Sequence, residues 1–152
     1  IIFSLISIVS IHARTGLFTK FFDKIPEWDD TRELLDWKQI ASAIEKNIPK
    51  KNLSSIATLS WYDSGQLTCA FNYRFAVGII GDKKNHFKYM EKENKEFSTL
   101  IEVRLLNKID KSNLSQKIRE FGYKINKQIN LPYLRGDRQY GIISVLSIER
   151  IG

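Results

Sequence analysis

The sequence predicts an α/β fold with a layered, partly parallel sheet and flanking helices. Short apolar runs rich in Ile, Val, Leu and Thr recur along the chain, and segments with helical spacing of apolar residues lie between them. Segments that alternate in this way favour a sheet with helices packed on it. A length of 152 residues, 43% of them hydrophobic and 27% charged, suits one globular domain with a single core.

The first eleven residues form an apolar segment without any charge. A helix of this length would rise about 16 Å, which is short of the about 30 Å hydrocarbon core of a bilayer. A signal peptide is disfavoured, because no basic region precedes the segment and no small-residue cleavage site follows it. Two interpretations remain: a buried strand or helix of this domain, or the end of a longer transmembrane helix. The lack of an initial methionine favours the second.

The first helix of the domain is expected to begin at Asp30 and to end before Pro49. Asp30 and Glu33 have the spacing of a capping box, and acidic residues at a helix start suit the positive end of the helix dipole. Apolar residues then recur with helical spacing from Trp37 to Ile48.

The remaining elements follow in alternation. A helix is predicted over 61–71, where Asp63 could act as the cap and Gln66 reach back to it, and another over 111–122, which Gly122 would end. The predicted strands share β-branched and aliphatic residues and cover 54–60, 74–82, 98–106 and 140–151.

Four carboxylates lie at the start of the first helix, and they invite a catalytic or metal-binding interpretation. On a helix only residues three or four positions apart share a face, and helix starts attract acidic residues for electrostatic reasons alone. We therefore expect capping and dipole stabilisation from these residues, which are Asp29, Asp30, Glu33 and Asp36.

No other motif assembles a catalytic or metal site. The histidines His12 and His86 stand apart from each other and from cysteine, so a zinc site is not expected. The single cysteine, Cys69, lies in an apolar setting and is expected to be a small buried hydrophobe. We expect no catalytic residue, no cofactor and no metal in this chain.

Two segments match a known pattern. Residues 28–44, with Asp29, Thr31 and Trp37, resemble the segment D-P-T-x-x-x-x-G-W that follows the last transmembrane helix in glycosyltransferase family 39, although Asp30 and Asp36 replace its proline and glycine. The family includes dolichyl-phosphate-mannose protein mannosyltransferases and lipid A aminoarabinose transferases. Residues 54–77 resemble the next unit of the family, a strand and an aromatic-rich helix, at Tyr62, Gln66, Leu67 and Phe71.

The resemblance implies that residues 1–26 are the end of a transmembrane segment and a connector, and that 27–152 form one extracytoplasmic α/β domain. Such enzymes transfer a sugar from a polyprenyl-phosphate donor to a lipid, protein or glycan acceptor, and their catalytic aspartate lies in the membrane portion. The isolated chain would then be inactive. Its implied partners are the membrane portion of the same protein, the acceptor substrate and anionic lipid head groups.

The net charge of +7 leaves an alternative open, a small basic binding module for nucleic acid or an anionic surface. Lysines between 83 and 95 alternate with glutamates, which is typical of a solvated face, and no nucleic-acid motif accompanies them, so nucleic acid is not the expected partner. An independent small α/β enzyme is a third hypothesis, which only the fold class supports.

Overall fold

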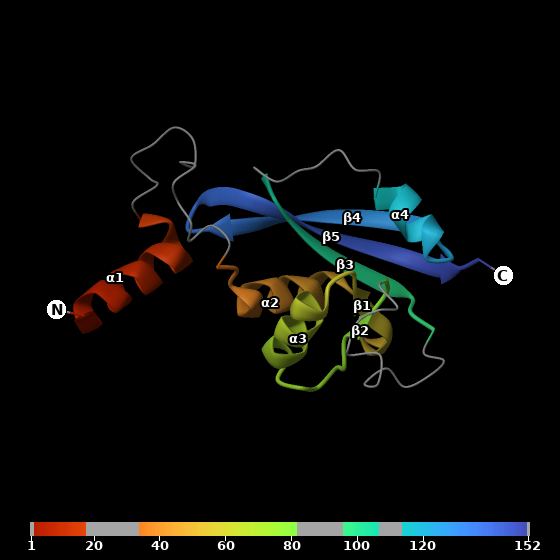
Figure 1. Ribbon diagram of the computed structural model, residues 1–152, viewed down its shortest axis with the longest axis horizontal. Helices are drawn as coiled ribbons and strands as arrows, with labels where there is room; N and C mark the ends of the chain where they lie inside the picture. The colour runs from red at the N-terminus through yellow and green to blue at the C-terminus, as the bar shows by residue number, and fades with distance from the viewer. Residues whose placement is uncertain (1, 18–33, 82–95, 107–113, 152) are drawn as a thin grey trace.

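The computed structural model describes residues 2–17, 34–81, 96–106 and 114–151. These residues form an α/β structure around a five-stranded mixed sheet with the strand order β2-β1-β3-β5-β4 (Figure 1). The central strand β3 (Thr99–Leu105) is parallel to β1 (Ile56–Thr58), which is parallel to β2 (Gly78–Ile79). On its other side β3 is antiparallel to β5 (Arg138–Arg150), which pairs with β4 (Tyr123–Arg135). The predicted partly parallel α/β sheet is confirmed.

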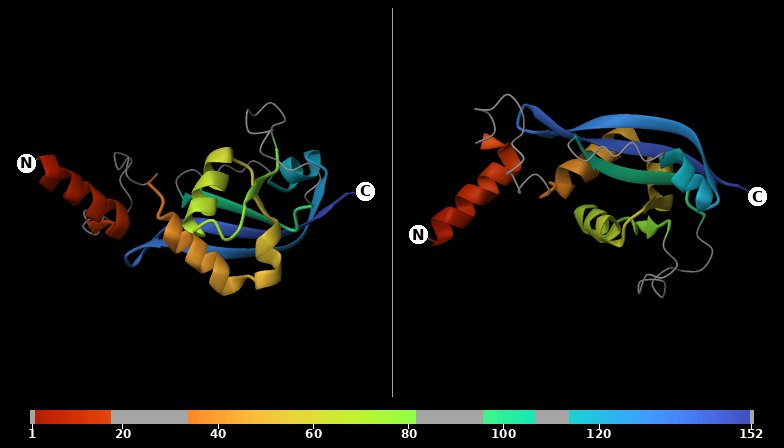
Figure 2. Two further views of the ribbon diagram at one scale, coloured as in Figure 1. Left: turned by 90° about the horizontal axis from the view of Figure 1, so that it is seen from below. Right: turned by 45° about the horizontal axis from the view of Figure 1, so that its top comes forward.

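Helices cover both faces of the sheet (Figure 2). On the first face, α2 (Trp37–Asn47) and α3 (Trp61–Ala70) pack on a core that includes Ile56 and Ile101. On the second face, α4 (Leu114–Glu120) places Ile118 against Ala57 and Leu100. Successive strand residues thus enter different cores, because side chains alternate between the two faces of a sheet. A short 3-10 helix, η3 (Lys50–Ser55), leads into β1.

The helix starts differ from the sequence prediction. The helix expected from Asp30 begins at Trp37, where the Asp36 carboxylate accepts a hydrogen bond of 3.1 Å from the Gln39 backbone N–H. Likewise, α3 is capped by Ser60 and not by Asp63, whose backbone N–H is the donor. Both helices use the residue just before their first turn, as N-caps do. Asp30 and Glu33 lie outside the described residues.

Strand β4 has no counterpart among the predicted elements. Ile125, Ile129 and Leu131 are all odd-numbered, yet Ile125 packs in the core under α4 while Ile129 and Leu131 pack in the core under α2 and α3. A β-bulge between Ile125 and Lys127 explains this change, since one extra residue reverses the alternation of side chains.

The segment before α2 is fastened to the β4–β5 hairpin. The buried Arg135 guanidinium donates a 2.8 Å hydrogen bond to the Leu34 carbonyl and lies 4.7 Å from the centre of the Tyr140 ring. The Tyr133 hydroxyl accepts a 2.8 Å hydrogen bond from the Asp36 backbone N–H. These contacts join residues about one hundred positions apart and fix where α2 begins.

The apolar N-terminal segment is a helix, α1 (Ile2–Thr15), at the end of the molecule opposite the C-terminus (Figure 1). Every side chain from Phe3 to Ile11 is exposed, whereas His12 is buried. Among the helices of the described ranges, none has the combined length and apolar character needed to cross a bilayer.

Candidate functional site

Two regions bring together residues with functional potential: a groove between α1, α2 and α3, and a polar row on the second face of the sheet. Two positions that match the transferase pattern, Trp37 and Gln66, line the groove, and a third, Tyr62, contacts Trp37. Trp37, at the start of α2, is nearly buried, and its ring meets that of Tyr62 edge to face with centroids 6.4 Å apart. Gln66 lies one helical turn after Tyr62 and lines the same groove as Trp37.

The other matching positions have different places. Leu67 and Phe71 have no exposed surface and belong to the core on the first face of the sheet. They are therefore packing residues of α3 and its C-terminal end. Asp29 and Thr31 lie outside the described residues. Of the four clustered carboxylates, Asp36 caps α2 as expected of a helix start, and the other three also lie outside the described residues.

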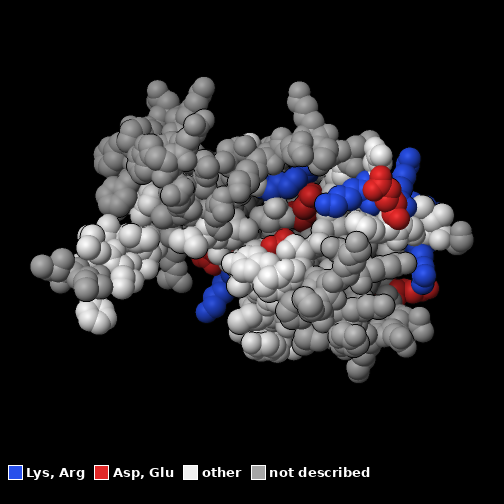
Figure 3. Space-filling model, in the orientation of Figure 1, with Lys and Arg blue, Asp and Glu red and all other residues white. Residues whose placement is uncertain are grey.

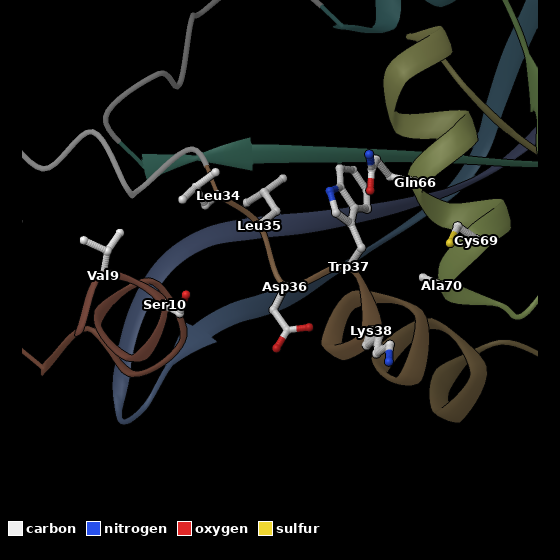
Figure 4. A pocket seen from close by; sticks show the side chains of 10 residues that line it. All are labelled: Val9, Ser10, Leu34, Leu35, Asp36, Trp37, Lys38, Gln66, Cys69 and Ala70. Carbon is white, nitrogen blue, oxygen red and sulfur yellow. The ribbon is translucent and has the colours of Figure 1, made fainter. Parts of the chain in front are cut away.

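The groove has a volume of about 410 Å³. In Figure 4 the Trp37 ring and the Gln66 amide point toward each other, while Asp36 and Lys38 point to the other side. Helix α1 contributes Val9 and Ser10, so the wall of the groove is formed by this helix together with residues of the domain. The lining residues are Val9, Ser10, Leu34, Leu35, Asp36, Trp37, Lys38, Gln66, Cys69 and Ala70.

Cys69 is an exposed residue in this groove, so its predicted burial is wrong. The buried face of α3 is made by Ser64 and Leu67, and Phe71 follows at the helix end. Cys69 lies two residues after Leu67 and therefore on another side of the helix. The apolar neighbours in the sequence concealed this, because adjacent helical residues face different directions.

The second region follows from the topology of the sheet. Strands β1 and β3 are adjacent and parallel, but α3 after β1 packs on the first face and α4 after β3 packs on the second. In open α/β sheets, ligands bind where the connections diverge in this way, at the carboxyl ends of the strands. Here β1 ends at Thr58, and β3 continues past it with Glu102 and Arg104.

Three polar residues lie side by side across the sheet at this position, and a fourth, Arg104, is hydrogen-bonded to one of them. Glu102 on β3 is opposite Ser144 on β5, which is opposite Asn130 on β4. Arg104 donates from Nη2 to Ser144 Oγ at 3.1 Å, and Ser144 Oγ donates to Asn130 Oδ1 at 3.0 Å. Ser144 is completely buried. We call Glu102, Arg104, Asn130 and Ser144 the polar row.

Glu102 and Arg104 form an ion pair that leaves hydrogen-bonding capacity unused. Glu102 Oε2 and Arg104 Nε are 3.2 Å apart, and their side chains are 21% and 26% exposed. Both atoms are shielded from solvent, and among the described residues neither makes a hydrogen bond of good geometry. A shielded polar group without such a bond is costly, so these two atoms need an explanation.

The carboxylates near the row hold their protons more tightly than usual. Burial raises the pKa of Glu102, the negative charge of Asp63 raises it further, and the charges of Arg104 and Lys117 oppose the shift. Burial raises the pKa of Asp63 from 3.8 to about 6. Both shifts reflect the cost of a charge that has lost part of its hydration.

The sequence interpretation did not identify the polar row. Glu102 and Arg104 interrupt an otherwise apolar strand at alternate positions, and this was the available signal. Asn130 lies on the strand that was not predicted, and its pairing with Ser144 depends on the register of β4 and β5. Among the described residues, no group of three or more His, Cys, Asp or Glu side chains could hold a metal ion.

Comparisons with known proteins gave no match to this chain. No protein-family model matches it. Neither a curated protein nor a solved structure matches it. The function must therefore be inferred from the residues and their arrangement.

Proposed function

We propose that this chain is the non-catalytic extracytoplasmic domain of an integral membrane glycosyltransferase that uses a polyprenyl-phosphate sugar donor, and that α1 is part of its membrane anchor. The observation that supports membrane attachment is the surface of α1. Its exposed apolar side chains lie on several sides of the helix, with Phe3 86% exposed, and they include Leu5, Ile6, Ile8, Val9 and Ile11.

Such a surface is unfavourable in water, at about 25 cal/mol for each Å² of apolar area. The segment from Phe3 to Ile11 has no charged residue, so it can enter hydrocarbon without desolvating a charge. Two hydroxyls of the helix are satisfied internally: Ser7 Oγ donates to the Phe3 carbonyl at 2.9 Å, and Thr15 Oγ1 donates to the Ile11 carbonyl at 2.8 Å. Internal hydrogen bonds of this kind suit a lipid environment.

The glycosyltransferase part of the proposal rests on the sequence resemblance and on one spatial relation. Trp37 and Gln66, two positions that match the family pattern, line the groove to which α1 contributes Val9 and Ser10. If α1 lies in the membrane, this groove is near the bilayer surface. A domain held there could cover the membrane portion of the enzyme or meet its acceptor.

Vesicle flotation tests the anchor. The chain is mixed with neutral phosphatidylcholine vesicles, and we expect it to float with them. The double substitution Leu5→Ser and Ile8→Ser should abolish flotation, because it removes apolar surface from α1. The matched control is Trp61→Ser with Leu106→Ser, which removes exposed apolar side chains elsewhere and should leave flotation unchanged.

A different pattern would favour the alternative function. Binding only to anionic phosphatidylglycerol vesicles, with loss at high salt and no effect of the α1 substitutions, would show attraction of the basic domain to an anionic surface. Failure to bind either kind of vesicle would contradict the anchor.

Sugar transfer is tested separately, with membranes that contain the product of the complete reading frame. Radiolabelled polyprenyl-phosphate sugars should donate to an endogenous acceptor in these membranes, whereas the isolated chain should transfer none. Transfer by the isolated chain would overturn the non-catalytic role. Lack of transfer with every donor would overturn the transferase assignment and leave the membrane anchor standing.

A further inference from the structure

We propose that the polar row, together with Asp63, binds the hydroxyl groups of a carbohydrate. This inference goes beyond the proposed function and does not depend on it, because it rests on the side chains of this chain alone. The row lies where open α/β sheets bind their ligands. Glu102 and Arg104 extend past the carboxyl end of β1, where the helices after β1 and β3 pack on opposite faces of the sheet.

The face of the sheet that carries α4 changes from apolar to polar along its strands. Where α4 covers this face, the residues under it are apolar: Leu100, Leu146 and Ile148 pack with Ile118. At the next position on the same face of the sheet, the residues are polar: Glu102, Ser144 and Asn130. A face built only for packing would continue the apolar pattern.

Ordinary solvent exposure does not explain the change either, because Ser144 is completely buried and Glu102 is only one-fifth exposed. A polar face that simply contacts water would leave its side chains hydrated. Glu102 and Arg104 are partly withdrawn from water, and one atom of each, Glu102 Oε2 and Arg104 Nε, lacks a hydrogen bond of good geometry among the described residues.

The charges around the row select the class of ligand. Asp63 and Glu102 are acidic, whereas Arg104 and Lys117 are basic, and all four influence the same position. A simple anion would meet the two carboxylates, and a simple cation would meet the two basic groups. Among the described residues that are visible in Figure 3, Lys and Arg lie beside Asp and Glu. A neutral ligand rich in hydrogen-bonding groups fits best.

A carbohydrate has this chemistry, because each hydroxyl both donates and accepts. Carboxylates accept, guanidinium donates, and the Asn130 amide does both. Neighbouring strands lie about 4.8 Å apart, so adjacent polar groups of the row are separated by a distance comparable to the width of a pyranose ring. Glu102 Oε2 and Arg104 Nε are shielded, but the side chains that carry them are 21% and 26% exposed, so a ligand can reach their other atoms.

The test is a titration of the isotope-labelled chain, followed in amide correlation spectra. The probes are the methyl pyranosides of glucose, galactose, mannose and xylose, added singly. At least one should cause saturable shifts of the amides of residues 102–104 and 144, with a Kd of about 1 mM, typical of a single-sugar contact of about 4 kcal/mol.

Glu102→Gln keeps the shape of the side chain and removes its charge, and it should weaken binding about tenfold. Asp63→Asn provides a second variant at a half-buried position, should Glu102→Gln disturb the fold. The matched control is Glu149→Gln, on the exposed end of β5, where Glu149 pairs with Lys124 at 3.1 Å; it should bind as the unchanged chain does.

Three results would overturn the proposal: no saturable shift with any pyranoside, shifts confined to residues away from the polar row, or binding that neither Glu102→Gln nor Asp63→Asn weakens. Inorganic phosphate serves as a further probe. If phosphate shifts the same amides and the pyranosides do not, the row is an anion site and the carbohydrate proposal fails. None of these results depends on membrane binding or sugar transfer.

Discussion

At the scale of single residues, the unusual property of this protein is the partial burial of charge at the carboxyl end of β1. Asp63 and Glu102 have lost part of their hydration, and their negative charges repel each other. The Arg104 guanidinium, whose Nε lies 3.2 Å from Glu102 Oε2, offsets part of the cost of the Glu102 charge. Folding therefore tolerates an electrostatic cost here, which is common at sites that bind ligands.

This cost makes stability depend on pH through Asp63. Its pKa is about 6 in the folded protein against 3.8 ordinarily, so between these values the folded state holds a proton that the unfolded chain releases. Stability consequently falls as pH rises through this window and then stays lower. Asp63→Asn cannot titrate, so its free energy of unfolding should increase relative to the unchanged chain from about pH 4 to about pH 7.

Urea unfolding at several pH values measures this difference. Glu149→Gln is the control of opposite sign: hydrogen bonds from Asn126 and Lys124 lower the pKa of Glu149, so its contribution to stability is lost as pH falls through the lowered pKa. A difference between Asp63→Asn and the unchanged chain that does not vary with pH would contradict the raised pKa of Asp63.

At the scale of elements, the close contact of β3 with β5 aligns the polar row. Gly141 on β5 is opposite Leu105, and a Cβ atom at this glycine would lie 2.6 Å from the Arg104 carbonyl oxygen. That oxygen belongs to the backbone and can move only with the strand. Glycine at this position therefore allows the two strands to approach, as elsewhere where backbones meet closely.

Gly141→Ala should therefore destabilise the protein by about 1–3 kcal/mol, the usual cost of overpacking. The matched control is Gly65→Ala in α3, where an added Cβ meets nothing within 4 Å and the residue is exposed. Alanine should stabilise that helix by about 0.5–1 kcal/mol. Urea midpoints measure both changes. Equal midpoints for Gly141→Ala and the unchanged chain would mean that β5 can move away from β3 at no cost.

At the scale of the whole molecule, the apolar and polar surfaces lie in different places. Helix α1 projects at the end opposite the C-terminus, whereas the polar row lies on the sheet face that also carries α4 (Figures 1 and 2). The exposed side chains from Phe3 to Ile11 are not part of the two cores, which consist of residues from the sheet, from α2, α3 and α4, and from the segments that connect them.

Removal of residues 1–11 should therefore leave the domain folded, with a free energy of unfolding within about 0.5 kcal/mol of the unchanged chain. His12 is retained because it is buried. Urea unfolding followed by circular dichroism measures the difference. A loss of several kcal/mol would show that α1 is part of the folding unit and would weaken its role as an anchor.

The sequence predicted the fold class and several elements for clear physical reasons. The strand over 98–106 and the strand over 140–151 were recognised because buried central strands are apolar along most of their length, and both are confirmed as β3 and β5. Strand β4 was missed because it lies at the edge of the sheet, where polar residues dominate one side, and because the bulge after Ile125 breaks its alternation.

The candidate site was less predictable than the fold. Trp37, Tyr62 and Gln66 were selected from a pattern, and they do meet across α2 and α3. The polar row was not selected, because Glu102 and Asn130 are 28 positions apart and meet only through β5. No local property of either residue indicates that partner.

Taken alone, the sequence determined which apolar segments form the central strands, and so the α/β class. It also determined the uncharged character of the first helix. These properties depend on local composition and periodicity. Only the tertiary structure decided that α2 begins at Trp37 with Asp36 as its cap, that α1 exposes its apolar side chains, and that polar groups meet across β3, β5 and β4. Each of these depends on contacts between residues far apart in the chain, which register and packing create and local propensity does not encode.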